Sequence, residues 1–253
     1  MSQGIVGLRV LVTRPEEAGE ALARALLGRG ASPWFVPAIR ILIDPNDPAL
    51  ARARAELERS DRLLLSSRYG LVALLAMGAQ VAKTAKVWAV GAQTAKMCQA
   101  SGFEVACAAE AGGLAELAKD ILRVDPTPNL RVLWASGDLS EDTAVEPLRS
   151  AGHTITSIPV YKNVNAFIGK GAPPVERLLE MDAALFASPS AVKNLCAAVP
   201  PEALDRFRAR WRVVVIGETT RRAAADSGFK RIAVAPEPSN EGLLAALETS
   251  ARN

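Results

Sequence analysis

The stretch RVLVTRPEEAGEALARALLGRGASPWFVPAI (Arg9–Ile39) is followed later in the chain by a related stretch of equal length, RVLWASGDLSEDTAVEPLRSAGHTITSIPVY (Arg131–Tyr161). Aligned without a gap, the two begin on the same Arg-Val-Leu and match Pro37 with Pro159. A match of this length indicates an internal repeat, and a repeat constrains the fold more strongly than any local pattern.

The repeat continues in two further pairs of segments. LLLSSRYGLVALL from Leu63 resembles ALFASPSAVKNLC from Ala184, and GAQTAKMCQASGF from Gly91 resembles GETTRRAAADSGF from Gly217. The three pairs follow one another at nearly constant offset, which chance does not explain. We therefore interpret the chain as a duplication.

Each repeated segment joins a short apolar run to a helical pattern. The runs LRVLV, RLLLS, KVWAV, RVLWA, AALFA and RVVVI are continuous and short, as in strands buried on both faces. After Thr13 the pattern changes to a period of four, with Ala18, Leu22 and Leu26 on one helix face. Alternating strands and helices of this kind predict two similar α/β units, each with a parallel sheet covered by helices.

Two segments at equivalent places in the repeat are typical of linkers. PAIRILIDPNDP (37–48) and PVYKNVNAFIGKGAPP (159–174) alternate at first and then become rich in Pro, Gly, Asn and Asp. We expect the chain to leave a first domain, build the second and return. Domain 1 is then discontinuous, with residues 1–39 and 166–253, and domain 2 comprises 42–160.

Composition narrows the class of function. The chain carries 23% charged residues and a net charge of +3, without a basic block, so a nucleic-acid partner is not expected. No apolar run reaches membrane-spanning length and no secretory signal begins the sequence, so we expect a cytoplasmic protein. Cys98, Cys107 and Cys196 form no CxxC pair and are expected to be reduced thiols. With His153 as the one histidine, expected at a solvated turn, no metal site is predicted.

Small hydroxyl residues and glycines follow the predicted strands. Ligands of parallel α/β sheets bind at the carboxyl ends of the strands, and helix starts there offer free backbone N–H groups to carboxylates or phosphates. Ser and Thr at such turns also serve as ordinary helix caps, and for any one of them alone capping is the stronger interpretation. The candidates are Thr13, Arg14, Ser66, Ser67, Arg68, Gly91, Thr94, Ser136, Gly137, Ser188, Ser190, Gly217, Thr219 and Thr220.

Motifs of other enzyme classes are absent from the sequence. It contains no GxGxxG after a strand, no GxxxxGK[ST] and no GxSxG. Tyr161, one of two tyrosines, stands where a strand meets the second linker. Its phenol could donate a proton to a leaving oxygen. The alternative is a strand residue with a buried ring and a solvated hydroxyl.

The ordered set of motifs resembles the uroporphyrinogen-III synthase family over nearly the whole chain. The motifs are VLVTRP, LFASPSAV, VWAVGAQTA with SGFEV, IPVYKNV, VVVIGETT with SGF, and PEPSNEGLLAAL. The resemblance implies two flavodoxin-like α/β domains joined by two extended linkers, with a cleft between them.

The resemblance also implies an enzyme, a cyclising hydro-lyase of tetrapyrrole (heme) biosynthesis. Its substrate would be hydroxymethylbilane, a linear tetrapyrrole with many carboxylates, closed to uroporphyrinogen III with inversion of ring D and loss of water. No cofactor or metal is implied, and we expect a monomer. Tyr161 matches the family's tyrosine and is assigned the catalytic proton transfer. Thr94 and Thr220 match its threonines, and the other strand-end residues are assigned substrate contacts.

Two departures from the family pattern leave an alternative open. Glu141 and Asp142 stand where the family often has a basic residue, and Arg68-Tyr69 replaces small or Asn-like residues. Acids at the first position would repel a substrate carboxylate unless they face away. The alternative is a non-catalytic paralogue that binds a tetrapyrrole or another polyanion. A ligand-sensing module like periplasmic binding proteins is a third possibility.

Overall fold

The computed structural model describes residues 4–76, 85–109 and 113–252. Within this part the apolar runs identified in the sequence form strands, and a helix follows each of them along the chain. None of the helices in these ranges is long and apolar enough to cross a bilayer.

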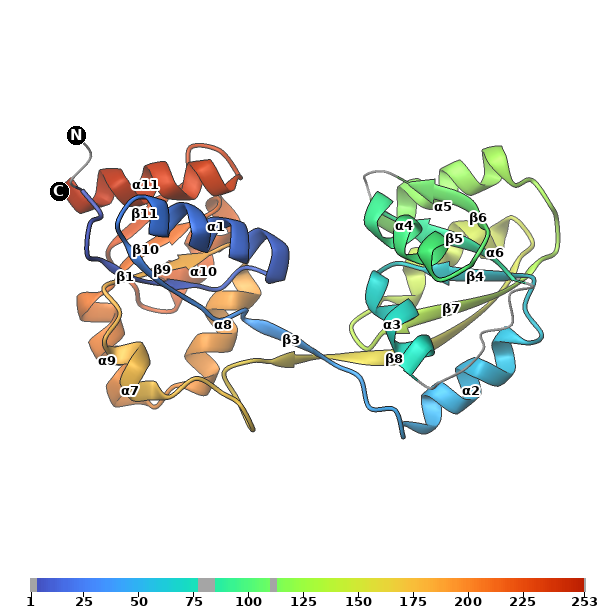
Figure 1. The fold of residues 1–253 in the computed structure, drawn as a ribbon, viewed down its shortest axis with the longest axis horizontal. Coiled ribbons are helices and arrows are strands. Elements are labelled where there is room, and N and C mark those ends of the chain that lie inside the picture. The colour runs from blue at the N-terminus through green and yellow to red at the C-terminus, as the bar shows by residue number, and fades with distance from the viewer. Residues whose placement is uncertain (1–3, 77–84, 110–112, 253) are drawn as a thin grey trace. The chain divides into compact units, whose positions relative to one another are not determined.

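The chain divides into two compact units. Unit 1 comprises Met1–Arg40 and Val164–Asn253, and unit 2 comprises Ile41–Asn163. The chain leaves unit 1 within β3 (Ile39–Leu42) and returns within β8 (Thr154–Asn165), and Figure 1 shows both strands extending out of unit 2. Both crossings fall in segments that the sequence marks as linkers.

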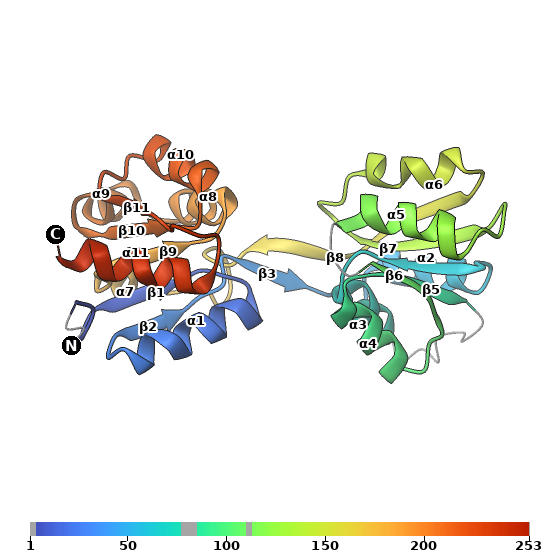
Figure 2. The same cartoon turned by 90° about the horizontal axis from the view of Figure 1, so that it is seen from above.

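Unit 1 is a five-stranded sheet in the order β11-β10-β9-β1-β2. All of its paired strands are parallel. Helices cover both faces: residues of α1 and α11 share one apolar cluster with one face of the sheet, and residues of α7, α8, α9 and α10 share another with the opposite face (Figure 2). The elements are β1 Arg9–Val12, α1 Glu16–Gly28, β2 Ser32–Phe35, α7 Val175–Leu179, β9 Ala183–Phe186, α8 Pro189–Ala198, α9 Pro201–Arg210, β10 Arg212–Val215, α10 Glu218–Asp226, β11 Ile232–Val234 and α11 Asn240–Arg252.

Unit 2 is a six-stranded sheet in the order β3-β8-β7-β4-β5-β6. Its strands from β8 to β6 pair in parallel. Helices α2, α3 and α4 pack on one face, and α5, the 3-10 helix η1 and α6 pack on the other. The remaining elements are α2 Pro48–Leu57, β4 Arg62–Leu65, α3 Arg68–Ala76, β5 Lys86–Val90, α4 Ala92–Ala100, β6 Val105–Ala109, α5 Gly113–Val124, β7 Arg131–Gly137, η1 Asp142–Val145 and α6 Glu146–Ser150.

The two sheets have the same strand order once the repeated segments are matched. In unit 1 the order is β2-β1-β9-β10-β11, and the matching strands of unit 2 follow as β8-β7-β4-β5-β6. The register agrees as well, because Val10 pairs with Ala183 and the equivalent Val132 pairs with Arg62. Counted along unit 1 the order is the flavodoxin-like one. The predicted fold class, two parallel-sheet α/β units built by duplication, is confirmed.

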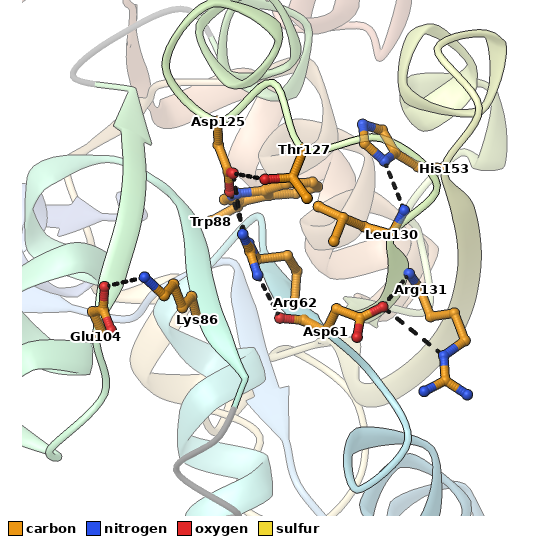
Figure 3. Close-up of polar contacts among 10 residues, drawn as sticks. All are labelled: Asp61, Arg62, Lys86, Trp88, Glu104, Asp125, Thr127, Leu130, Arg131 and His153. Carbon is orange, nitrogen blue, oxygen red and sulfur yellow. Dashed lines mark hydrogen bonds and ion pairs between the residues drawn. The ribbon is translucent and has the colours of Figure 1, made fainter.

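A partly buried polar network lies at the amino ends of the unit 2 strands, at the edge opposite the candidate ligand residues. Arg62 donates from Nε and Nη2 to the Asp125 carboxylate at 2.7 and 3.1 Å, and Trp88 Nε1 donates to it at 2.9 Å (Figure 3). Thr127 Oγ1 donates to the same carboxylate at 3.0 Å. Because the Asp125 carboxylate accepts hydrogen bonds from Arg62, Trp88 and Thr127, it connects β4 and β5 to the end of α5.

His153 corrects one expectation from the sequence. It is only 6% exposed, rather than a solvated turn residue. Its ring stands edge-on to Trp88 with centroids 5.6 Å apart, and its Nδ1 accepts from the Leu130 backbone N–H at 3.3 Å (Figure 3). Burial lowers its pKa below the ordinary value. The glycine before it predicted the turn correctly, but the contact of the ring with Trp88 of β5 is not visible in the local sequence.

Acid is expected to destabilise unit 2 through Asp125. The hydrogen bond from Arg62 lowers the pKa of this carboxyl to about 2, against 3.8 ordinarily. A depressed carboxyl pKa stabilises the fold fully above the unfolded value, so about 2 kcal/mol should be lost as the pH falls from about 4 to 2. Urea unfolding of wild type and Asp125→Asn at pH 7 and pH 3 measures this. The difference between the two proteins should shrink at pH 3, whereas Asp120→Asn on the surface of α5 should show no such pH dependence.

Candidate active site

The carboxyl ends of four neighbouring unit 2 strands bring the predicted residues of this unit to one edge. Strands β8, β7, β4 and β5 lie side by side in that order. Tyr161 belongs to β8 and the next strand ends at Gly137; Ser66, Ser67 and Arg68 follow β4, while Gly91 and Thr94 follow β5. Because the strands are parallel, these residues share one edge, as the sequence analysis expected.

A bulge in β8 directs Tyr161. Ser136 pairs with Pro159, but the next residue, Gly137, pairs with Tyr161, so Val160 is the extra residue. Val160 and Tyr161 are both buried, at 4% and 8% exposure, although neighbours in a regular strand point to opposite faces. Bulges often re-aim a side chain next to an active site, and they are uncommon in parallel pairs.

Gly137 provides the space for the Tyr161 ring. A Cβ at this position would lie 2.6 Å from Cε2 and 2.9 Å from the hydroxyl of Tyr161. In addition, the backbone N–H of Asp138 donates a hydrogen bond to the Tyr161 carbonyl at 3.1 Å. The ring therefore lies against the end of β7, in space that a side chain at Gly137 would occupy.

Two side chains from the start of α3 surround the phenol. The Ser67 hydroxyl lies near enough to the Tyr161 hydroxyl to lower the pKa of this phenol by hydrogen bonding. The ring of Tyr69 packs at a tilt against the Tyr161 ring, with centroids 5.9 Å apart. The Arg68 guanidinium carbon lies 5.2 Å from the Tyr69 centroid, and Nη1 of Arg68 is 3.5 Å from Gln93 Oε1. The Tyr161 side chain is thus enclosed by Gly137, Ser67 and Tyr69.

The Tyr161 phenol is protonated at neutral pH. Burial raises its pKa above the ordinary value, while the hydrogen bond with Ser67 lowers it, and the Asp138 carboxylate raises it again. A neutral phenol can give up its proton to a leaving oxygen, and the Ser67 hydroxyl can then donate to the phenolate. The site can therefore act as a general acid.

Removing the Ser67 hydroxyl is expected to raise the pKa of Tyr161. The chain has only two tyrosines, so Tyr69→Phe leaves Tyr161 as the only phenol that ionises. In this background, ultraviolet titration should show ionisation at higher pH in Ser67→Ala and unchanged ionisation in Ser67→Thr. Ser66→Ala is the matched control, because Ser66 accepts instead from Trp134 Nε1 at 3.2 Å. An unshifted curve for Ser67→Ala would contradict the assigned hydrogen bond.

Other predicted hydroxyls of this unit are buried. Ser136 is 2% exposed and its Oγ lies 3.3 Å from that of Ser157, while Thr94 is 5% exposed within α4. Gly91 precedes α4 with a φ of 84°, a left-handed conformation that favours glycine. It leaves the first backbone N–H groups of α4 at the edge of the sheet.

The acidic stretch after β7 is largely engaged within unit 2. Asp138 accepts from the backbone and side-chain nitrogens of Asn163 at 2.8 and 2.9 Å, which ties the end of β8 to β7. Asp142 pairs with Arg149 at 2.9 Å, and this hydrogen bond lowers its pKa. Glu141 is exposed. Sequence reasoning missed Asp138, Asn163 and the ring contact of Tyr69, although Tyr69 as the second tyrosine was a usable signal.

The predicted residues of unit 1 lie at the carboxyl edge of its own sheet. Thr13 donates its hydroxyl to the Leu185 carbonyl at 2.7 Å, so this hydrogen is not available to a ligand. Ser188 caps α8 by accepting from the Ala191 N–H at 3.2 Å, and its Oγ lies 2.9 Å from that of Ser190. Gly217 and Thr219 stand at the start of α10, and Thr220 is buried there. Arg14 and Ser188 line a cavity of about 270 Å³.

Among the described residues, no group of three or more His, Cys, Asp or Glu side chains is placed to hold a metal ion. The chemistry that the two edges offer is that of hydroxyls, backbone N–H groups, arginine and one enclosed phenol.

A family model described as Uroporphyrinogen-III synthase HemD matches residues 20–245. The chain belongs to the uroporphyrinogen-III synthase family. This confirms the resemblance drawn from the motifs. The match covers most of both units, including β8 with Tyr161, and begins after β1 and the start of α1.

Two relatives show the range of similarity within the family. The uroporphyrinogen-III synthase of Salmonella typhimurium is 24% identical over 254 residues, covering 95% of this chain and 100% of the relative. The porphyrin biosynthesis protein HemD of Ruminiclostridium josui is 28% identical over 234 residues, covering 88% of this chain. The match spans 45% of that second relative, so the chain accounts for less than half of its length.

Solved structures of the family share the fold. The uroporphyrinogen-III synthetase of Helicobacter pylori superposes with a TM-score of 0.57 at 16% identity, covering 95% of this chain and 97% of the other. A mutant uroporphyrinogen III synthase of Thermus thermophilus superposes with a TM-score of 0.54 at 18% identity, covering 97% and 99%. Both similarities support the two-domain α/β architecture.

Proposed function

We propose that this chain is an enzyme that closes hydroxymethylbilane to uroporphyrinogen III, with inversion of ring D and loss of water. The observation that carries the proposal is the enclosed, protonated phenol of Tyr161, held by Gly137 and Ser67 at the ligand-binding edge of unit 2. Family membership supplies the substrate and reaction class. The proposal requires neither metal nor organic cofactor.

The reaction begins with cleavage of the carbon–oxygen bond of the substrate's hydroxymethyl group. Tyr161 donates its proton to the departing oxygen, water leaves, and a cation remains on the first pyrrole. Ring D attacks this cation, passes through a spiro intermediate and reconnects in the inverted sense. The pyrrole carbon that closes the macrocycle loses a proton, and this proton balances the one that Tyr161 gave up.

The protein's task in this reaction is chiefly to position the bilane. Polar groups at the sheet edges suit its carboxylates, because helix starts present N–H groups and the positive end of the helix dipole there. A fixed geometry decides which pyrrole carbon attacks, so orientation supplies much of the rate and all of the isomer selectivity. We assign the strand-end residues of both units to these contacts.

The structure weakens the reason for a non-catalytic alternative. That alternative depended on the acids after β7, and Asp142 is paired with Arg149 while Asp138 holds Asn163.

We further propose that the enzyme is a monomer in the cytoplasm, where its three free cysteines stay reduced. Light scattering coupled to size-exclusion chromatography tests the monomer.

Isomer analysis tests the proposed function. Hydroxymethylbilane is generated in the presence of the purified chain, and the oxidised porphyrins are separated by chromatography. The uncatalysed bilane closes to the uninverted type I isomer, so a dominant type III product is expected. Type I product alone, from folded protein, would refute the enzyme and favour the binding protein.

A further inference from the structure

The cavity of unit 1 lies at the carboxyl ends of two adjacent strands. It holds about 270 Å³ and is lined by residues that follow β1 and β9, with Ala38 and Ile39 on one side. The start of α8 borders it through Ser188 and Ala191. Of the residues that line it, Arg14 is the one with a charge.

Among the described side chains, Arg14 is partly buried without an acidic partner, as are Arg40 and Arg212, which donate to backbone carbonyls. Of these three arginines, Arg14 is the one that lines the cavity. Its Nη1 donates to the neutral Asn240 Oδ1 at 2.7 Å, and its Nε is buried without a hydrogen-bond partner. Among the side chains that the structure describes, no carboxylate forms an ion pair with Arg14, and burial lowers the pKa of its guanidinium. By contrast, Arg62 has Asp125 and Arg9 has Asp182.

An unpaired, partly buried guanidinium is costly unless an anion compensates it. The Nε and Nη2 atoms of a guanidinium form an edge that matches the two oxygens of a carboxylate. Arg62 binds Asp125 through this edge, and the same edge of Arg14 is proposed to bind a ligand carboxylate. The small side chains of Ala38 and Ala187 leave room beside it for methylene groups. The hydroxyl pair of Ser188 and Ser190 adds polar atoms at the start of α8.

We propose that this cavity binds one carboxylate-bearing side chain of the substrate, with Arg14 as its counter-ion. The inference rests on the proposed function for the identity of the ligand. The carboxylate draws the guanidinium into the cavity and supplies the partner that Nε lacks. The cavity then fixes one arm of the bilane at a site that takes no part in the proton transfer at Tyr161.

Arg14→Gln is expected to raise KM for hydroxymethylbilane about tenfold, which corresponds to about 1.4 kcal/mol. Because the interaction is the same in the ground state and the transition state, kcat should change less than about twofold. Arg24→Gln on the exposed side of α1 is the matched control for charge and should leave both constants unchanged. Arg14→Lys should give an intermediate KM, because lysine keeps the charge and loses the planar edge.

The outcomes separate this site from the proposed function. If wild type makes the type III isomer and KM is unchanged in Arg14→Gln, the site is wrong and the function stands. If wild type makes no type III isomer, the carboxylate site is tested by binding of uroporphyrin III instead. Quenching of tryptophan fluorescence measures this binding. Weaker binding by Arg14→Gln than by Arg24→Gln supports the carboxylate site, and equal or absent binding overturns it. If Arg14→Gln does not fold, the same comparisons with Arg14→Lys apply.

Discussion

Tyr161→Phe is expected to lower the rate of type III isomer formation by about a hundredfold to a thousandfold, the range that a positioned general acid contributes. The change removes one oxygen and leaves the ring on Gly137, so the fold and the bulge of β8 should persist. KM should change little, because the phenol acts on the leaving oxygen rather than on substrate carboxylates. Single-turnover assays with hydroxymethylbilane, stopped before spontaneous closure becomes significant, measure this directly.

Tyr69→Phe is the matched control for this experiment. It removes the same atom from the neighbouring ring, 5.9 Å away, and keeps the ring contact. Its rate should fall by less than about fivefold, since this hydroxyl donates no proton to the substrate. A Tyr161→Phe rate within about fivefold of wild type would contradict the assigned proton transfer. The isomer assignment of the product would be unaffected by that result.

Asp125→Ala is expected to lower the free energy of unfolding by about 3 kcal/mol or more, as for other broken buried ion pairs. The substitution leaves the Arg62 guanidinium, whose side chain is only 12% exposed, without its counter-charge. It also removes the acceptor of Trp88 Nε1. Urea unfolding followed by circular dichroism at pH 7 gives the value.

A double variant distinguishes charge from packing in this network. Arg62→Met combined with Asp125→Leu removes both charges and keeps similar volume, which is often close to neutral for buried pairs. It should therefore recover at least half of the stability lost in Asp125→Ala. If the double variant is as unstable as the single one, the Arg62–Asp125 pair is not the source of the loss. The network lies at the edge opposite Tyr161, so type III activity below the unfolding transition should remain.

The candidate site divides into residues that the sequence predicts and relations that it does not. The position of Tyr161 at the end of a strand, and of Ser67 after another, follows from alternating apolar runs and the rule for parallel sheets. Their proximity requires β8, β7 and β4 to be neighbours in the sheet, and β4 is far from β7 and β8 along the chain. The repeat indicates which strands are equivalent, but pairing partners arise only when the sheet assembles.

The sequence by itself determined the duplicated parallel α/β fold and the residue types at the strand ends. These depend on local periodicity and on the repeat, which are properties of the chain. Tertiary structure decided that Val160 bulges, so that Tyr161 turns onto Gly137. It also decided that His153 is buried and that Arg14 donates to the neutral Asn240. Burial and charge pairing join residues far apart along the chain, and their energies depend on which atoms meet in the packed fold.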